Sequence, residues 1–332
     1  MKIAVIGSGA WGTALAVTLC KNGHDVTLWA RDARKAEEIR STRYNPRLED
    51  VQLPEKLKIS ADANCVAGCT LVVIASPSFA IRNVCRLIQP HLEENTVMVS
   101  VTKGIEEKTL LRMSQVVQEE THRPVVALTG PSHAEELAMG MPTGCVAASP
   151  NQAHAELVQD AFMTDYFRVY TNPDIVGAEL GGALKNVVAL CAGVTEGMGY
   201  GDNMKAMLIT RGMTEMARLG IVMGASRDTF AGLAGMGDLI VTCTSQHSRN
   251  RRAGVLIGRG EKPASAMEQV GAAVEGYYAA KSAWELAKQF GVDMPIVRAA
   301  YAVLYEDIAT EKVVEALLNR SRKAEHEDTG WN

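Results

Sequence analysis

The feature that most constrains the fold is a glycine-rich turn close to the first residue. The segment Gly7-Ser8-Gly9-Ala10-Trp11-Gly12 follows the apolar run Lys2–Ile6 and leads into the helical pattern Ala10–Lys21. Between a strand and a helix, the first glycine of G-x-G-x-x-G makes the tight turn, the second lets the backbone approach a pyrophosphate, and the third lets the helix pack on the strand. The helix amides then favour the phosphates. The turn predicts a dinucleotide-binding unit; a glycine turn without a ligand is the alternative.

Short apolar runs alternate with helical patterns up to residue 172, and helical patterns alone follow. This alternation predicts right-handed crossovers and a doubly wound, mostly parallel α/β sheet. We expect a Rossmann-type dinucleotide-binding domain over residues 1–175, an all-helical substrate domain over 176–320 and a polar tail over 321–332. The predicted strands are Lys2–Ile6, Asp25–Ala30, Leu71–Ala75, Thr96–Val101, Val125–Thr129, Gly144–Ala148 and Tyr166–Tyr170. The predicted helices include Ala10–Lys21, Phe79–Ile88, Lys108–Glu120, Ala153–Phe162, Asp174–Met198, Val292–Leu304 and Thr310–Leu318.

Composition argues against several classes of protein. The 332 residues carry a net charge of −4 and only 5% aromatics, which argues against a nucleic-acid partner. Apolar runs such as Leu71–Ala75 are too short to span a bilayer, and the apolar start leads into the glycine turn rather than resembling a signal peptide. The seven cysteines are scattered, with Cys65 and Cys69 the closest pair, so neither a disulfide framework nor a zinc site is expected. We expect a cytoplasmic protein without a metal.

The end of the second predicted strand bears on the choice between NAD and NADP. NAD enzymes typically carry an acidic residue there, which holds the ribose hydroxyls. Here Arg31 stands at that position, followed by Asp32, Arg34 and Lys35. A guanidinium can bind a 2′-phosphate and stack on adenine. Arg31 therefore favours NADP, whereas Asp32 leaves NAD open, and a solvated basic helix start is the non-binding alternative.

Polar residues follow two further strands, at the edge where a parallel sheet binds its ligands. Lys103 precedes a glycine and offers a positive charge for an anionic substrate, unless it is only a surface lysine. In Gly130-Pro131-Ser132-His133-Ala134, the spacing of Ser132 and Glu135 predicts a capping box at a helix start, which is also an anion site. His133 is a candidate general acid, although a lone histidine beside a cap is more often structural.

One lysine is unusual among the helical patterns of the second half. Within residues 174–198, Lys185 lies about 100° away from the apolar stripe, on a face of glycines and alanines. Interior glycines destabilise a helix, so such a face suggests a close approach by another group. That group is either a ligand, which makes a desolvated Lys185 an acid or base, or another helix, with Lys185 reaching out to water. A carbonyl reduced by hydride needs a proton, and Lys185, with Asn186 beside it, is the candidate to supply it.

Two polar segments further on predict a phosphate site. The glycine-dense turn Gly232–Gly237 ends at Asp238, which could bind a substrate hydroxyl or a lysine ammonium. Ser248 can cap a helix that begins at Arg249, and Asn250 follows. Helix amides, a hydroxyl and guanidinium groups together suit a phosphate, unless the arginines form only a solvated helix end. With the two lysines above, this describes a small anionic carbonyl substrate, a phosphate ester.

In these segments, taken in order, the chain resembles the bacterial type of NAD(P)-dependent sn-glycerol-3-phosphate dehydrogenase, from Lys2 to about Leu318. The resemblance implies interconversion of dihydroxyacetone phosphate and sn-glycerol 3-phosphate, which feeds phospholipid synthesis. It also implies a Rossmann-type domain, a helical domain like the C-terminal domain of 6-phosphogluconate dehydrogenase, and a homodimer. The motifs that carry it are Gly7–Ala16, Thr102–Ile105, Leu128–Glu135, Gly182–Val187, Gly232–Thr242, Ser248–Asn250, Val274–Gly276 and Met294–Val297.

The resemblance further implies roles for single residues, with Lys185 as the proton donor and acceptor. The chain departs from the family in the loop Arg47–Asp50, whose cofactor contacts are therefore left open. It also has Ala10 where the family often has serine, so a hydroxyl contact to the cofactor is absent there. The implied substrate residues are Lys103, Gly130, Ser132, Lys185, Asp238, Ser248, Arg249 and Asn250. The cofactor, NADP or NAD with NADPH favoured, would be contacted by Gly7, Gly9, Trp11, Gly12, Arg31, Lys103, Ala134, Arg249 and Glu275.

Two other interpretations stay open on the residues alone. A 2-ketoacid or ketopantoate-type reductase shares the cofactor turn and a helical-domain lysine, but its carboxylate substrate does not need the cap Ser248-Arg249-Asn250. A nucleotide-sensing protein without turnover would not need Lys185 and Asp238 at one crevice. The expected partners are a small phosphate ester and a second copy of the chain, with no nucleic acid and no membrane span.

Overall fold

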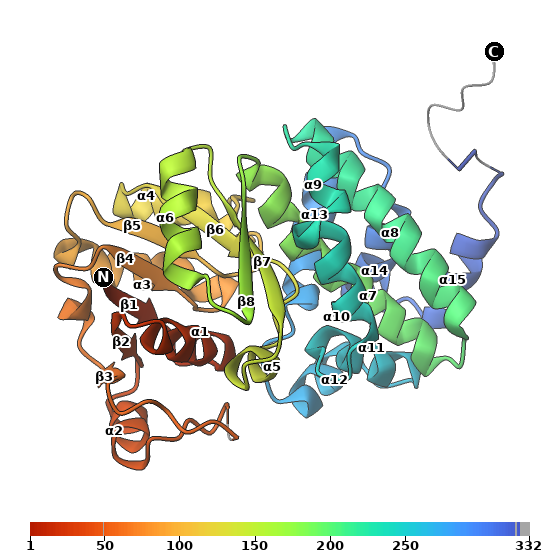
Figure 1. The fold of residues 1–332 in the computed structure, drawn as a ribbon. Coiled ribbons are helices and arrows are strands. Elements are labelled where there is room, and N and C mark those ends of the chain that lie inside the picture. Colours follow the sequence, from red (N-terminus) through yellow and green to blue (C-terminus); the bar gives the residue numbers. More distant parts are fainter. Residues whose placement is uncertain (49, 323, 326–332) are drawn as a thin grey trace.

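The computed structural model describes residues 1–48, 50–322, 324 and 325, which form a sheet part and a helical part side by side (Figure 1). Eight strands make one sheet in the order β3-β2-β1-β4-β5-β6-β7-β8. All neighbouring strands run parallel except β6 and β7, which confirms the predicted mostly parallel sheet. The strands are β1 (Lys2–Ile6), β2 (Asp25–Trp29), β3 (Lys58–Ser60), β4 (Leu71–Ile74), β5 (Val97–Ser100), β6 (Val125–Thr129), β7 (Thr143–Ala148) and β8 (Phe167–Asn172).

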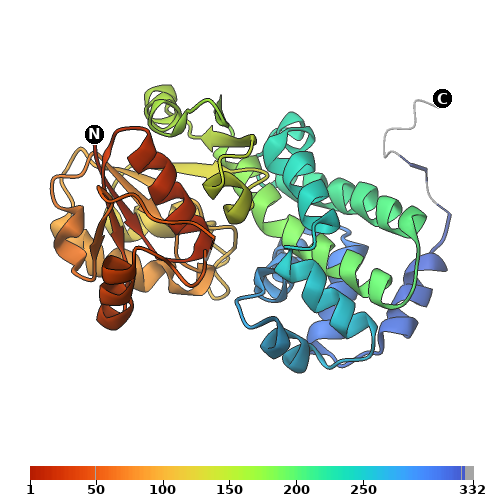
Figure 2. The ribbon, with the colours of Figure 1, turned by 60° about the horizontal axis from the view of Figure 1, so that its bottom comes forward.

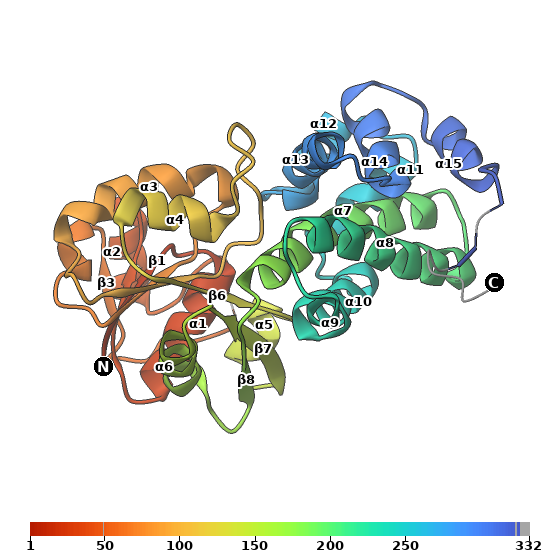
Figure 3. The same ribbon diagram turned by 90° about the horizontal axis from the view of Figure 1, so that it is seen from above.

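Helices cover both faces of this sheet, because successive side chains of a strand point to opposite faces. Val5 of β1 belongs to the core shared with α1 and α6, whereas Ile6 belongs to the core shared with α3 and α4. Figure 3 shows these two helix pairs on opposite sides of the strands. The helices of the sheet part are α1 (Ala10–Lys21), α2 (Ala33–Thr42), α3 (Ile81–Ile88), α4 (Met113–Thr121), α5 (Ala134–Ala138) and α6 (Gln152–Phe162), with short turns η1 (Ala63–Val66), η2 (Ser78–Ala80) and η3 (Gln89–His91).

Two elements of the sheet part differ from the predictions. Strand β3 is not among the predicted strands, because three residues are too few to show an alternating pattern. The helix predicted over Lys108–Glu120 begins only at Met113. Residues 105–112 instead form a hairpin closed by a bridge between its ends, and Leu110 has a φ of 60°, which a right-handed helix does not contain.

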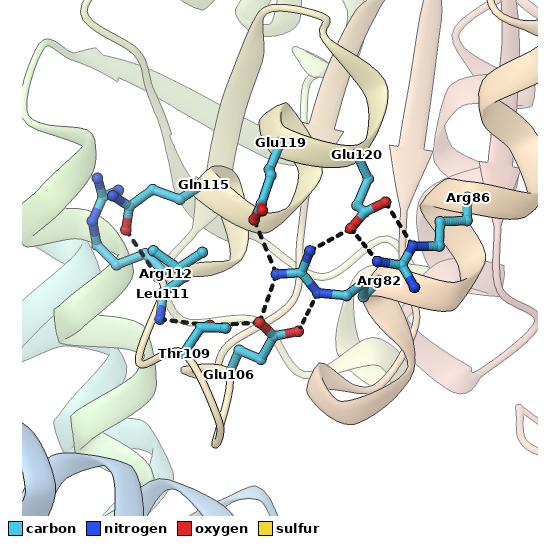
Figure 4. A network of polar contacts seen from close by, with 9 residues as sticks. All are labelled: Arg82, Arg86, Glu106, Thr109, Leu111, Arg112, Gln115, Glu119 and Glu120. Atoms are coloured by element: carbon cyan, nitrogen blue, oxygen red, sulfur yellow. Dashed lines mark hydrogen bonds and ion pairs between the residues drawn. The ribbon is translucent and has the colours of Figure 1, made fainter.

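The hairpin 105–112 is fixed by an ionic network (Figure 4). Arg82 of α3 donates to Glu106 of the hairpin through Nε at 2.8 Å and through Nη2 at 2.7 Å. The same guanidinium also pairs with Glu120 of α4. All three side chains are less than one fifth exposed, at 19%, 17% and 12%. Because the hairpin directly follows Lys103, the network fixes the segment that carries this lysine.

All regular elements described after Asn172 are helices. The longest of them, α7, runs from the sheet into the middle of the helical part (Figure 2). The helices are α7 (Ile175–Gly197), α8 (Asp202–Val222), α9 (Arg227–Ala231), η4 (Leu233–Gly237), α10 (Asp238–Thr244), α11 (Arg249–Gly258), α12 (Pro263–Val270), α13 (Glu275–Phe290), α14 (Pro295–Tyr305) and α15 (Thr310–Leu318).

The small residues of α7 let its backbone touch that of α11. A Cβ on Gly193 would lie 2.1 Å from the carbonyl oxygen of Arg251, and a Cβ on Gly258 would lie 2.1 Å from that of Val194. Of the two explanations for this face, helix packing is therefore the correct one for Gly193. Lys185 nevertheless does not reach out to water, since it is only 5% exposed.

The expectation that no apolar segment is long enough to cross a membrane needs correction. Helix α7 has 23 residues and is long and apolar enough to cross a membrane, judged by length and composition alone. However, 89% of its apolar window is buried inside the fold. Its apolar surface thus serves the helical core. Most of the predicted polar tail 321–332, and Glu49 in the loop Arg47–Asp50, lie outside the described residues.

Candidate active site

Two lysines from different parts of the fold meet on one carboxylate. Lys103 follows β5, Lys185 lies on α7, and Asp238 begins α10. The Nζ atom of Lys103 lies 2.6 Å from Oδ2 of Asp238, and the Nζ atom of Lys185 lies 2.8 Å from Oδ1. Lys185 also donates to Thr242 Oγ1 at 2.5 Å. An ammonium has three N–H groups, so among the described residues one N–H of Lys185 stays available for a ligand.

Burial tunes the acidity of this group. Asp238 is 1% exposed, and its carboxylate is compensated by the two ammonium groups. Burial lowers the pKa of Lys185 to about 8, aided by the charge of Lys103 and opposed by the charge of Asp238. A lysine with such a pKa can both donate and accept a proton near neutral pH.

The loop after β6 completes the surroundings of Lys103. Its Nζ atom donates to the carbonyl oxygen of Gly130 at 2.9 Å and to Ser132 Oγ at 2.8 Å. The predicted capping box is wrong, because His133 rather than Ser132 is the residue at the start of α5 and no side chain caps that helix. The hydroxyl of Ser132 points to the lysine instead.

His133 lies at the edge of this group without a defined partner. Its ring centroid is 5.7 Å from that of His247, and its buried Nε2 has no hydrogen-bond partner among the described residues. Burial lowers the pKa of His133, so the ring is neutral at neutral pH. The contact joins the loop after β6 to the loop before α11.

The predicted cap at the start of α11 is present and lies close to α7. Ser248 Oγ accepts from the backbone amide of Arg251 at 3.2 Å, and the side chain of Arg249 is exposed. Asn250 donates to Asn186 Oδ1 at 2.9 Å and accepts from the amide of Gly276 at 2.8 Å, so it connects α11 with α7 and α13. One arginine of this cluster is already engaged, because Arg251 pairs with Glu196.

The glycine-rich turn fits the phosphates of a dinucleotide. Gly7 has a φ of 127°, and a Cβ there would lie 2.5 Å from the carbonyl oxygen of Ala75. A Cβ on Gly12 would lie 2.1 Å from the carbonyl oxygen of Gly7, which explains the close packing of α1 on β1. Gly9 faces open space with nothing within 4 Å, and no side chain caps α1. The free amides at this helix start suit an anionic group.

The residues after β2 favour a basic cofactor contact over an acidic one. Asp32 caps α2, accepting from the amides of Arg34 at 2.9 Å and Lys35 at 3.4 Å. The carboxylate predicted as the alternative ribose partner is thus already engaged by the backbone. Arg31, by contrast, is exposed at the strand end. Trp11 is half-buried at the start of α1.

Glu275 lies between the two parts of the fold. It begins α13 and accepts from the hydroxyl of Ser78 at 2.7 Å and from the amide of Ser78 at 3.3 Å. Burial raises the pKa of its carboxyl group. Ala134, which the resemblance also assigns to the cofactor, is buried in the first turn of α5.

Two further polar residues have partners that the sequence analysis did not assign. Thr242, one turn after Asp238 on α10, donates to the carbonyl oxygen of Asp238 at 2.6 Å while it accepts from Lys185. Glu179, two turns before Lys185, is 6% exposed and accepts from the amide of Ser114 at 2.7 Å and its hydroxyl at 2.6 Å. A charged residue inside an apolar helical pattern was the available signal for Glu179.

Comparison with known proteins gives one consistent result. Residues 2–155 match the N-terminal part of NAD-dependent glycerol-3-phosphate dehydrogenases, and residues 174–315 match the C-terminal part. A glycerol-3-phosphate dehydrogenase (NAD(P)+) of Thermoanaerobacter sp. (strain X514) is 48% identical over 326 residues, which cover 98% of this chain and 99% of that protein. The protein of the same name from Geobacillus kaustophilus is 49% identical over 334 residues, covering 98% and 97%.

Solved structures agree with the sequence matches. The glycerol-3-phosphate dehydrogenase of Coxiella burnetii superimposes with a TM-score of 0.92 at 37% identity, over 96% of this chain and 98% of that one. A ketopantoate reductase of the PanE/ApbA family from Ralstonia eutropha has a TM-score of 0.64 at 18% identity, over 95% and 100%. The second likeness shows a shared fold only.

Proposed function

The chain belongs to the NAD-dependent glycerol-3-phosphate dehydrogenase family, and from this premise we propose how its crevice interconverts dihydroxyacetone phosphate and sn-glycerol 3-phosphate with NAD or NADP. The observation that carries the proposal is the buried group of Lys103, Lys185 and Asp238 at the carboxyl ends of the strands. There a protonated amine meets the edge of the sheet where α/β folds hold a dinucleotide.

Lys185 acts as the acid in reduction and as the base in oxidation. Bound NAD(P)H supplies the hydride that converts the ketone carbon into an alcohol carbon. The ketone oxygen gains negative charge as this happens, and the available N–H of Lys185 gives it a proton. Asp238 holds the ammonium in place, and its charge keeps enough Lys185 protonated despite burial.

The phosphate of the substrate binds at the start of α11. The cap by Ser248, the exposed guanidinium of Arg249 and the free helix amides favour an anion there. Asn250 holds this helix against Asn186, next to Lys185. Lys103, with Gly130 and Ser132, takes the opposite side of the substrate.

The cofactor binds along the glycine-rich turn and Arg31. Gly7, Gly9 and Gly12 shape the turn for the pyrophosphate, and Trp11 lies at its edge. Arg31 takes the 2′-phosphate, so NADPH is the preferred cofactor. The remaining contacts proposed are Lys103, Ala134, Arg249 and Glu275.

The wider setting follows from the same family membership. We propose a dinucleotide-binding domain over residues 1–175 and a substrate domain over 176–320, since the last strand ends at Asn172 and α7 begins at Ile175. We further propose a cytoplasmic homodimer whose product supplies glycerol phosphate for phospholipid synthesis.

The test of the proposed function is a comparison of three ketones as substrates. We expect the purified chain to oxidise NADPH rapidly with dihydroxyacetone phosphate and slowly with dihydroxyacetone or ketopantoate. A preference for ketopantoate would favour the ketopantoate-type reductase, and binding of NADPH without turnover of any ketone would favour a nucleotide sensor.

Arg31→Asp is expected to weaken NADPH binding about ten- to hundredfold while changing NADH binding little, because a charged contact to the 2′-phosphate is lost. Cofactor titration followed by fluorescence measures both affinities. Arg34→Asp is the matched control, because the Arg34 side chain is 95% exposed one turn further on. An unchanged ratio of NADPH to NADH affinity in Arg31→Asp would show that Arg31 does not read the 2′-phosphate.

Arg249→Ala is expected to lower kcat/KM for dihydroxyacetone phosphate about ten- to hundredfold, because phosphate binding positions the carbonyl. The activity of the same variant with dihydroxyacetone should fall much less, since that ketone has no phosphate and only the proposed cofactor contact of Arg249 is lost. Arg252→Ala, an exposed arginine on the same helix, is the matched control. Equal losses with both ketones, or in both variants, would argue against a phosphate site at Arg249.

A further inference from the structure

The helical part carries a second groove in which none of the proposed active-site residues takes part. It lies between the end of α13, the start of α14 and the face of α15, and its volume is about 420 Å³. That volume falls within the range of about 300–1,000 Å³ typical of small-molecule sites. Figure 3 shows α14 and α15 at the end of the molecule away from the sheet. The groove is lined chiefly by apolar side chains, among them Val292, Met294, Ala302, Val313 and Leu317.

The charged residues of this groove are mostly basic. Arg298, Lys312 and Arg320 line it, against Asp293 as the single acid among its described lining residues. Asp293 pairs with Arg320 at 3.0 Å. With Glu306, which pairs with Arg298, three positive charges face two negative ones at this groove, against a net charge of −4 for the whole chain. This combination is complementary to a molecule with an apolar body and an anionic end.

Arg298 places a guanidinium in this groove. Its Nη2 pairs with Glu306 at 2.8 Å, and its guanidinium carbon lies 5.4 Å from the ring centroid of Trp284 and 6.0 Å from that of Tyr301. Its Nη1, however, is buried without a hydrogen-bond partner among the described residues. The side chain of Arg298 as a whole is 40% exposed and lines the groove, so an anionic oxygen can reach the guanidinium beside Glu306.

We propose that the groove binds an aliphatic carboxylate, with the carboxylate at Arg298 and the chain along the apolar floor. The aromatic rings hold the guanidinium in a fixed plane, so little side-chain freedom is lost when the carboxylate binds. A carboxylate suits the site because a guanidinium carries five N–H donors and Glu306 engages only part of them. Burial of the alkyl chain supplies the rest of the affinity.

The test titrates the full chain with dodecanoate below its micelle concentration, using calorimetry and the fluorescence of Trp284. We expect saturable binding of one dodecanoate per chain, and much weaker binding of dodecan-1-ol, which lacks the charge. Arg298→Gln should weaken dodecanoate about tenfold or more. Ala316→Leu, which enlarges an exposed side chain inside the groove, should also weaken it.

Lys288→Gln is the matched control. Lys288 also lies over the Trp284 ring, at 5.9 Å, but it does not line the groove, so its loss should leave dodecanoate binding unchanged. The turnover of dihydroxyacetone phosphate should be unaffected in Arg298→Gln, which separates this proposal from the proposed function.

Three results would overturn the proposal. The first is non-saturable binding of dodecanoate. The second is an equal loss of binding in Arg298→Gln and Lys288→Gln. The third is a native dimer that does not bind dodecanoate and that Ala316→Leu converts to monomer in sedimentation, which would show that a second copy of the chain covers the groove.

Discussion

Lys185→Ala is expected to lose about 10²–10⁴-fold in kcat for the reduction of dihydroxyacetone phosphate, the range of general acid catalysis. The variant loses the N–H that the ammonium group of Lys185 leaves available for a ligand among the described residues, and alanine supplies no proton to the developing alkoxide. NADPH should still bind, because the glycine-rich turn lies between β1 and α1, whereas Lys185 lies on α7. Steady-state kinetics and NADPH fluorescence on the same sample measure the two effects separately.

Two further variants define the chemistry at this position. Lys185→Arg should not restore turnover, because a guanidinium does not release its proton readily. Lys288→Ala removes an exposed lysine of α13 and should leave kcat unchanged. A Lys185→Ala enzyme with near-native kcat would disprove the assignment and direct attention to His133 or Lys103.

Asp238→Asn is expected to reduce both turnover and stability. The substitution keeps the shape but leaves the buried ammonium group of Lys185 and the partly buried one of Lys103 without their carboxylate, and breaking a buried pair in this way costs about 3–5 kcal/mol. It also removes the charge that opposes the lowering of the Lys185 pKa, so less Lys185 is protonated at neutral pH. We expect kcat/KM to fall by about two orders of magnitude.

Urea unfolding and steady-state kinetics measure both effects of Asp238→Asn. The control is Asp202→Asn, which removes an exposed carboxylate 3.6 Å from Lys205 and should change neither quantity, since exposed ion pairs contribute little. If Asp238→Asn unfolds at the same urea concentration as the native protein and keeps native turnover, the carboxylate does not organise the two lysines.

Local patterns predicted the parts of the fold that depend on neighbouring residues. The helix Ala10–Lys21 and the strand Val125–Thr129 are confirmed with their predicted bounds, because their apolar periodicity and their ends are encoded within each segment. The hairpin after Lys103 was wrongly predicted as the start of a helix. Its conformation depends on Arg82, which is more than twenty residues away in the sequence.

The candidate site shows the same difference between features that local patterns predict and features that depend on distant residues. The residue types of Lys103, Lys185 and Asp238 suggested acid–base and anion chemistry, but only the tertiary structure places one carboxylate between the two lysines. Ser132 has the spacing of a capping residue, but its hydroxyl accepts a hydrogen bond from Lys103 instead. The reason is that the carboxyl ends of the neighbouring parallel strands β5 and β6 lie side by side. The glycines of α7 suggested a close approach by a ligand. For Gly193, the group that approaches closely is instead the backbone of α11, about sixty residues later in the chain.

The most direct test of the account is the pH dependence of kcat/KM in the two directions of the reaction. The pKa of Lys185 is lowered to about 8, and the protonated amine is the form that donates a proton to the ketone oxygen during reduction. We therefore predict that kcat/KM for dihydroxyacetone phosphate falls as the pH rises through about 8, whereas kcat/KM for sn-glycerol 3-phosphate rises over the same interval. Both dependences should vanish from the residual activity of Lys185→Ala. The same pH limb in both directions, or a limb that persists in Lys185→Ala, would contradict the role of Lys185 as the proton donor and acceptor.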